Sequence, residues 1–216
     1  MELIAVENSR LLSLFLTRRL AGQPYMPDTV RALVERYRFS AFPQSLDQMK
    51  SEPIVFSHGI FAGVAIDGFN MFGDGVIISA RAPTDILDEF LVDVTDWSKS
   101  ALGLDRLETH SVSKMYESHV TFKTERDILK SINGFSEISK LLSAGLKKAT
   151  SQSAEFDPFG IMMAVDHSVL SGLKPIAFRL ERKAGLEFSM NYYSSGAPLK
   201  TKDHLAVLQK IHHRAA

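Results

Sequence analysis

Hydrophobic and polar positions along the chain follow two different periods, and these periods predict where helices and strands lie. Apolar spacing of three and four residues predicts helices that begin at Asp28 and Thr201 and helices that cover 84–102 and 135–149. Alternation of apolar and polar residues predicts strands at 3–6, 54–81, 107–123, 159–165, 175–182 and 186–193. Residues 9–20 fit either a helix or a buried strand.

Turn signals join most of the predicted strands directly to one another. Asp67-Gly68 and Asp74-Gly75 are dipeptides typical of tight hairpins. Because turns separate neighbouring strands more often than helices do, the fold class is α+β, with a mostly antiparallel sheet and helices packed against it. No internal repeat is visible in the sequence. We expect a single domain over 1–216, in which a polar linker at 150–154 precedes a C-terminal β-hairpin-plus-helix subunit from about 155.

Composition narrows the setting and the chemistry. The chain of 216 residues has no cysteine, which excludes disulfides, thiol catalysis and thiolate zinc sites and is in keeping with a cytoplasmic protein. The N-terminus lacks the basic stretch of a signal peptide. The longest apolar stretches are far shorter than the roughly 20 residues that a spanning helix needs, so we expect a soluble protein without a membrane span.

The charge distribution is more informative than the total charge. Lys plus Arg and Asp plus Glu number 25 each, and this balance argues against a dedicated nucleic-acid binder. Residues 51–105 nevertheless hold nine acids and two bases, a local net charge of −7. Such a block can bind a basic partner, or the basic surface of another copy of the chain.

The acidic residues concentrate on the predicted helix at 84–102, whose other face is apolar. They are Asp85, Asp88, Glu89, Asp93 and Asp96. Acids near a helix N-terminus are favourable, but the i,i+4 pair of Glu89 and Asp93 is not. Three interpretations follow: a solvated face, a partner-binding surface and carboxylate ligands for a divalent cation. One helix face alone rarely surrounds a cation with six oxygens, so no metal site is predicted.

Signatures of the common enzyme classes are absent from the sequence. There is no P-loop, no GxGxxG after a strand, no HExxH and no GxSxG, and no cofactor is expected. Enzymes with dispersed sites carry no such signature. The candidates for an acid/base role are His58, His110 and His167, the last with its neighbour Asp166.

These observations favour a non-catalytic interaction protein, either an assembly subunit or an inhibitor-type binder, that uses the acidic helix at 84–102. Its partner is another protein or, by self-association through acidic and basic surfaces, a further copy in a homo-oligomer. One alternative is an enzyme with a dispersed histidine and carboxylate site. The other alternative is a small-molecule sensor domain with an apolar pocket between the sheet and the helices.

Overall fold

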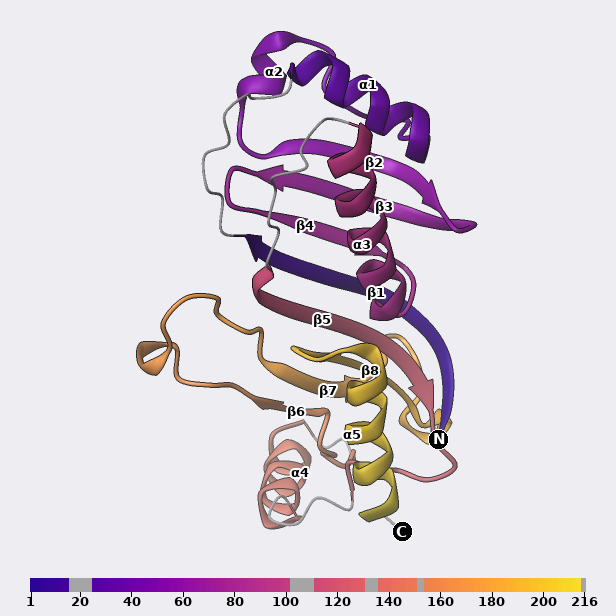
Figure 1. Ribbon diagram of the computed structural model, residues 1–216. Coiled ribbons are helices and arrows are strands. Elements are labelled where there is room, and N and C mark those ends of the chain that lie inside the picture. The colour runs from indigo at the N-terminus through magenta and orange to yellow at the C-terminus, as the bar shows by residue number, and fades with distance from the viewer. Residues whose placement is uncertain (16–24, 102–110, 131–135, 151–153, 215–216) are drawn as a thin grey trace.

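A single antiparallel sheet organises the molecule, which confirms the predicted α+β class. The computed structural model describes residues 1–15, 25–101, 111–130, 136–150 and 154–214. Its strands are β1 (Glu2–Phe15), β2 (Ile54–Phe61), β3 (Val64–Phe72), β4 (Gly75–Ala80), β5 (Ser111–Lys123), β6 (Gly160–Met163), β7 (Phe178–Arg182) and β8 (Tyr192–Ala197). They lie in the order β2-β3-β4-β1-β5-β8-β7-β6 (Figure 1).

Five helices accompany this sheet in the described part of the chain. They are α1 (Met26–Tyr37), α2 (Leu46–Lys50), α3 (Thr84–Ala101), α4 (Ser136–Thr150) and α5 (Thr201–Arg214). Two single 3₁₀ turns, η1 (His167–Val169) and η2 (Phe188–Met190), interrupt the C-terminal strands. The predicted linker at 150–154 begins at the last residue of α4, and residues 151–153 lie outside the described residues.

The structure decides two points of the sequence pattern. Residues 9–15 belong to β1, where Ser9, Leu11 and Ser13 are buried and their neighbours are not, which is the period of a strand. The last predicted strand, at 186–193, instead begins at Tyr192. Asn191 has a left-handed backbone (φ 54°) that ends η2, so the chain turns before it becomes extended.

The fold contains two copies of one unit, although the sequence shows no repeat. A long strand, a helix, three strands and a second helix follow one another as β1, α1, β2, β3, β4 and α3, with the short α2 inserted. The same order recurs as β5, α4, β6, β7, β8 and α5. The order of strands in the sheet is symmetric about the β1–β5 pair, so the two units are related by a pseudo-two-fold axis.

The register of the strands places this axis between two serines. Ser9 pairs with Ser118 across β1 and β5. Ser9 also pairs with Ala80, and Ser118 pairs with Ala197, so the two units match residue for residue at this point. The first residues of α3 and α5 meet beside them: the Thr84 amide donates to Thr201 Oγ1 (3.0 Å), and the Thr201 amide donates to Thr84 Oγ1 (2.9 Å). Each helix therefore caps the other.

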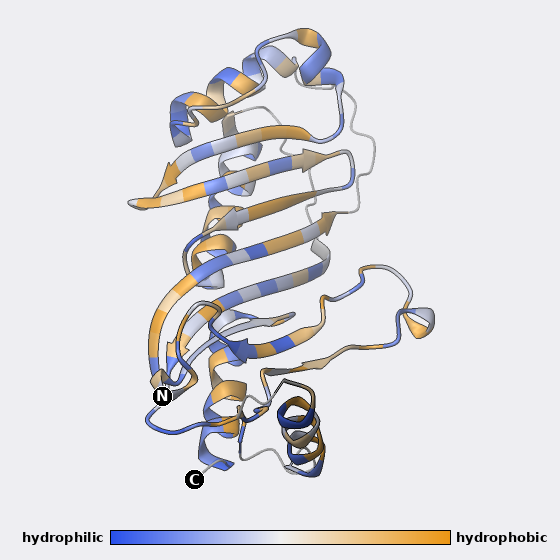
Figure 2. Ribbon diagram, turned by 180° about the vertical axis from the view of Figure 1, so that it is seen from behind, coloured by the Kyte–Doolittle hydropathy of each residue, from blue (hydrophilic) through white to orange (hydrophobic). Residues whose placement is uncertain are grey.

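Both helices that follow the hairpins cover the same face of the sheet. Helices α3 and α5 run across the strands on that face, and none of the described helices lies over the opposite face (Figures 1 and 2). One buried cluster joins β1–β4 to α1 and α3 and includes Phe56, Phe69 and Phe90. A second cluster joins β5, β7 and β8 to α5 and includes Phe122 and Leu180. The sheet thus presents two kinds of surface: helices on one side and bare strands on the other.

Candidate interaction surface

Helix α3 carries the acidic residues that the sequence singled out. It begins at Thr84, directly after Pro83, and buries Leu87, Phe90 and Leu91 against the sheet. These three positions follow helical spacing, which turns the acidic side chains away from the core. The predicted helix extended to Leu102; the described helix ends at Ala101.

Asp88 is held by three groups from distant parts of the chain. Its carboxylate lies 2.7 Å from Nζ of both Lys114 and Lys200, and Tyr116 donates its hydroxyl at 2.9 Å. Burial alone would raise the pKa of Asp88, but the hydrogen bonds from the two lysines and the tyrosine outweigh it and hold the pKa below its ordinary value. Asp88 therefore fastens α3 to β5 and to the start of α5.

Asp93 is fastened in the same way to α1. Arg36 donates from Nη2 to Oδ1 at 2.7 Å and from Nε to Oδ2 at 3.2 Å, and the Tyr37 hydroxyl donates to Oδ2 at 2.6 Å. Burial opposes ionisation here too, yet the hydrogen bonds of Arg36 and Tyr37 lower the pKa of Asp93. Burial, together with the nearby Asp93 carboxylate, raises the pKa of Tyr37. Two of the five predicted acids thus anchor the helix within the molecule.

The other three acids face outward. Asp85 and Glu89 are exposed, and neither forms an ion pair with any other described residue. Asp96 is also exposed, and its one ion pair among the described residues is with Lys99 of the same helix (3.2 Å). Asp88, Glu89, Asp93 and Asp96 border a shallow hollow of about 720 Å³, which is also lined by Arg36, Val92 and Trp97. Val92, in the middle of this surface, is 56% exposed. Carboxylates around a small apolar patch are suited to lysine and arginine side chains, because the patch contacts their aliphatic stems.

The histidine candidates are not brought together by the fold. His58 is exposed on β2 at one edge of the sheet, with a left-handed backbone (φ 56°). His167 is exposed beyond β6 at the other edge, and its Nε2 lies 3.1 Å from the Pro175 carbonyl. Asp166 caps η1 by accepting from the Ser168 amide (2.9 Å). His110 lies outside the described residues. His58 and His167 therefore cannot act in one site.

A cleft of about 600 Å³ on the uncovered face of the sheet was missed by the sequence reasoning. Its lining includes the acidic and basic residues Glu7, Glu117, Arg179, Glu181 and Lys183, together with His119. Glu7 accepts from Thr121 Oγ1 (2.6 Å) and from Lys183 Nζ (3.1 Å), which lowers its pKa. A Cβ on Gly196 would lie 2.8 Å from His119 Nδ1, so glycine is needed for the imidazole to lie there. The alternation of polar residues along β5 was the available signal for this surface.

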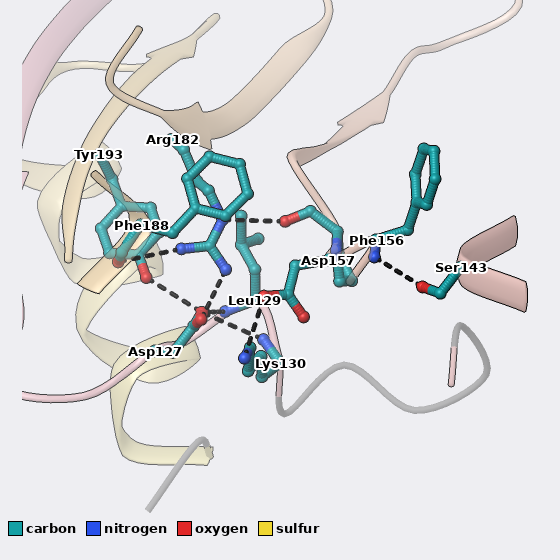
Figure 3. A network of polar contacts seen from close by, with 10 residues as sticks. Asp127, Leu129, Lys130, Ser143, Phe156, Asp157, Arg182, Phe188 and Tyr193 are labelled. Atoms are coloured by element: carbon teal, nitrogen blue, oxygen red, sulfur yellow. Dashed lines mark hydrogen bonds and ion pairs between the residues drawn. The ribbon is translucent and has the colours of Figure 1, made fainter. Parts of the chain in front are cut away.

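A buried ion pair organises the second unit (Figure 3). The Arg182 side chain is 2% exposed, and its Nη2 lies 2.5 Å from Oδ2 of Asp127. Arg182 also donates from Nε to the Pro158 carbonyl (3.0 Å) and stacks on the Phe188 ring. Tyr193 donates its hydroxyl to Asp127 Oδ1 at 3.2 Å, and burial, with the nearby Asp127 charge, raises the pKa of Tyr193 to about 12. Every polar group of this network has a structural partner, which is typical of a role in folding.

The comparisons with known proteins add no function. No protein-family model matches the sequence, and no curated protein matches it. Among the described residues, no group of three or more histidine, aspartate or glutamate side chains is arranged to hold a metal ion. Likewise, none of the described helices combines the length and the apolar character needed to cross a bilayer. The functional proposal therefore depends on the surfaces alone.

Proposed function

We propose that this chain is a non-catalytic interaction protein, an assembly subunit or an inhibitor-type binder, whose contact surface is the outer face of α3. This contact surface consists of Asp85, Glu89, Val92, Asp96 and Trp97. The proposal rests on the observation that the acids of α3 fall into two groups, one paired within the molecule and one exposed. Asp88 and Asp93 fix the helix to Lys114, Lys200 and Arg36, while Asp85 and Glu89 remain exposed without such partners among the described residues.

A helix anchored at two points is a suitable platform for binding. Side chains on a rigid element lose less conformational entropy when a partner binds, which leaves more of the interaction energy for affinity. The exposed carboxylates attract a basic surface over distances up to about a Debye length, roughly 8–10 Å at physiological salt. The partner class is therefore a protein with a Lys- and Arg-rich surface, and basic regions on another copy of this chain belong to that class. A cytoplasmic location is part of the proposal.

The test uses a basic peptide of about ten Lys and Arg residues as a probe. Calorimetric titration of the wild-type chain should show binding that weakens steeply as salt is raised, because the contacts are between charges. Reversal of two exposed acids, in the variant Glu89→Lys/Asp96→Lys, should weaken binding by about tenfold or more. Asp96 loses only an exposed pair with Lys99, and Glu89 has no ion pair among the described residues, so the variant should keep a melting temperature close to that of the wild type.

A matched control separates the site from the overall charge. Asp47→Lys/Asp203→Lys makes the same change in net charge at exposed positions on α2 and α5. We expect this control to bind the peptide within about twofold of the wild type, since it leaves α3 intact. Equal losses in both double variants would show that only net charge matters and would contradict the proposed surface.

The cleft on the uncovered face favours a second candidate function, the binding of a small molecule. Its volume of about 600 Å³ falls within the usual range of ligand sites, and Arg179 offers a cationic donor to an anionic group. Small carboxylates should then raise the melting temperature of the wild type and have no effect on Arg179→Ala. Identical shifts in both proteins would remove this candidate.

A further inference from the structure

Helix α4 points its apolar side away from the molecule. Ile138, Leu141 and Leu142 follow helical spacing and are 53%, 74% and 48% exposed. On the polar side of the helix, Ser143 Oγ accepts a hydrogen bond from the Phe156 amide (2.8 Å; Figure 3). The apolar face of an amphipathic surface helix normally packs against the core, and its polar face points to solvent. We therefore expect another surface to cover the exposed apolar face of α4.

The first unit shows how this fold can bury such a helix. Helix α1 occupies the same place in the repeated order as α4, and both lie beyond an edge of the sheet at opposite ends of the molecule (Figure 1). Yet α1 places Val30, Leu33 and Tyr37 in the core, each at most 3% exposed. The difference between two equivalent helices indicates that the cover for α4 comes from outside the described chain.

We propose that a second copy of the chain supplies it, with the two α4 helices antiparallel about a two-fold axis that passes between Leu141 and Leu142. In this arrangement the leucines of both copies meet at the axis. Ile138 lies opposite Gly145 of the partner subunit, so a large side chain faces a position with none. Gly145 is exposed and has nothing within 4 Å of the place where a Cβ would stand. The apolar face is thus complementary to itself in size.

The charges of α4 are complementary in the same arrangement. Glu137 lies in the first turn and Lys148 in the last, both on the same flank of the apolar face. Antiparallel pairing brings like flanks together, so Glu137 faces Lys148 of the partner subunit, twice by symmetry. The helix dipoles also run in opposite directions. Parallel pairing would instead leave Glu137 and Lys148 at opposite ends of the interface, where they could not pair. The pattern selects an antiparallel helix pair in an isologous dimer, and two-fold dimers are the commonest homo-oligomers.

The interface is small, so the dimer should be weak. A helix of 15 residues is about 22 Å long, and one helix pair falls below the roughly 1,200 Å² of a standard interface. A dissociation constant on the order of micromolar is expected. This contact does not involve α3, so it holds or fails independently of the proposed function.

Sedimentation over a range of concentrations tests the proposal with a closely matched control. Leu141→Glu should raise the dissociation constant at least about tenfold, because it places two charges at the axis. Val169→Glu makes the same change at a residue that is also 74% exposed but lies in η1, and it should leave the dimer unchanged. Glu137→Lys and Lys148→Glu should each weaken the dimer several-fold, while the double swap should restore it.

The absence of cysteine allows the orientation to be tested by cross-linking. In an antiparallel dimer, Leu141→Cys places two thiols beside the axis, and mild oxidation should give a covalent dimer. Ala149→Cys should not, since the two thiols would be about 22 Å apart along the helices. Cross-linking of Ala149→Cys alone would indicate parallel helices and overturn the proposal. A wild-type chain that stays monomeric to about 1 mM would overturn it as well. Binding of that monomer to phosphatidylserine vesicles, lost in Leu141→Glu, would instead assign the face to a membrane.

Discussion

At the scale of single residues, the structure shows that an acidic residue can have a structural or a binding role depending on its neighbours. The five acids of α3 look alike in the sequence. Asp88 and Asp93 meet cations and hydroxyls, while Asp85 and Glu89 meet solvent. The sequence could not make this distinction, because Lys114 and Lys200 lie 26 and 112 residues from Asp88 along the chain.

The first residue-scale prediction separates these two roles. Asp88→Asn should lower the free energy of unfolding by about 1–2 kcal/mol, because it removes the charge that accepts from two lysines and a tyrosine. Asp85→Asn, at an exposed position on the same helix, should change it by less than about 0.5 kcal/mol. Chemical denaturation measures both. Equal effects would mean that the contacts of Asp88 contribute nothing to stability.

The second residue-scale prediction concerns a buried histidine. His204 is fully buried, with Nε2 at 2.9 Å from Ser195 Oγ and Nδ1 at 3.2 Å from Ser118 Oγ. Ser195 donates its own proton to the Arg179 carbonyl (2.6 Å), so Ser195 Oγ accepts from His204 and Nε2 carries the imidazole proton. Burial, with a further effect of His119, lowers the pKa of His204 to about 4. The neutral ring is therefore the folded form.

The sign of the resulting pH dependence follows from linkage. A lowered pKa means that the unfolded chain binds the proton first, so stability falls as the pH drops from about 6.5 to about 4. The loss from this one group is about 3 kcal/mol at the acid end. The register makes Leu87 the equivalent residue in the first unit, so His204→Leu should fold and should flatten the stability curve in this window. An unchanged slope in the variant would contradict the assignment.

At the scale of secondary-structure elements, the second unit depends on polar contacts where the first depends on apolar ones. The register aligns Arg182 with Met71 and Tyr193 with Val76. The pattern of the sequence located most helices and strands, because period and turn residues are local properties. It could not orient α4, since both of its faces are compatible with a helix and only the tertiary structure decides which one packs.

The element-scale prediction tests the buried pair of Arg182 and Asp127. Arg182→Met should lower the free energy of unfolding by about 3 kcal/mol or more, because Asp127 keeps its charge without its cation. The double variant Arg182→Met/Asp127→Asn should be more stable than the single one, since the carboxylate that loses the Arg182 guanidinium is then replaced by a neutral amide. Denaturation of the three proteins gives the coupling. Additive losses would show that the two side chains act independently.

At the scale of the whole molecule, the pseudo-two-fold axis joins the two units through their most continuous contact. The β1–β5 pair runs from Glu2 to Phe15, and the reciprocal caps of α3 and α5 lie directly on it. The sequence shows no internal repeat, and the duplication is visible in the order of the elements and in the register of the strands. Whether the chain is one domain or has a distinct C-terminal subunit depends on whether its parts unfold cooperatively.

Two core variants, one in each unit, measure that cooperativity. Phe90→Ala and Leu180→Ala each remove a fully buried side chain, at a cost of about 2–5 kcal/mol. If the shared β-pair couples the units, both variants should shift one common transition in fluorescence and circular dichroism. Two separate transitions, each moved by one variant only, would show that the units unfold independently.

The most direct measurement for the proposed function uses the only tryptophan of the chain. Trp97 lines the hollow of α3, so its emission is sensitive to a ligand bound at that surface. Titration with the basic peptide should change the emission of the wild type in a saturable way, and the change should disappear in Glu89→Lys/Asp96→Lys. Calorimetric binding of the peptide without any change in Trp97 emission would place the contact elsewhere and contradict the interaction surface proposed for α3.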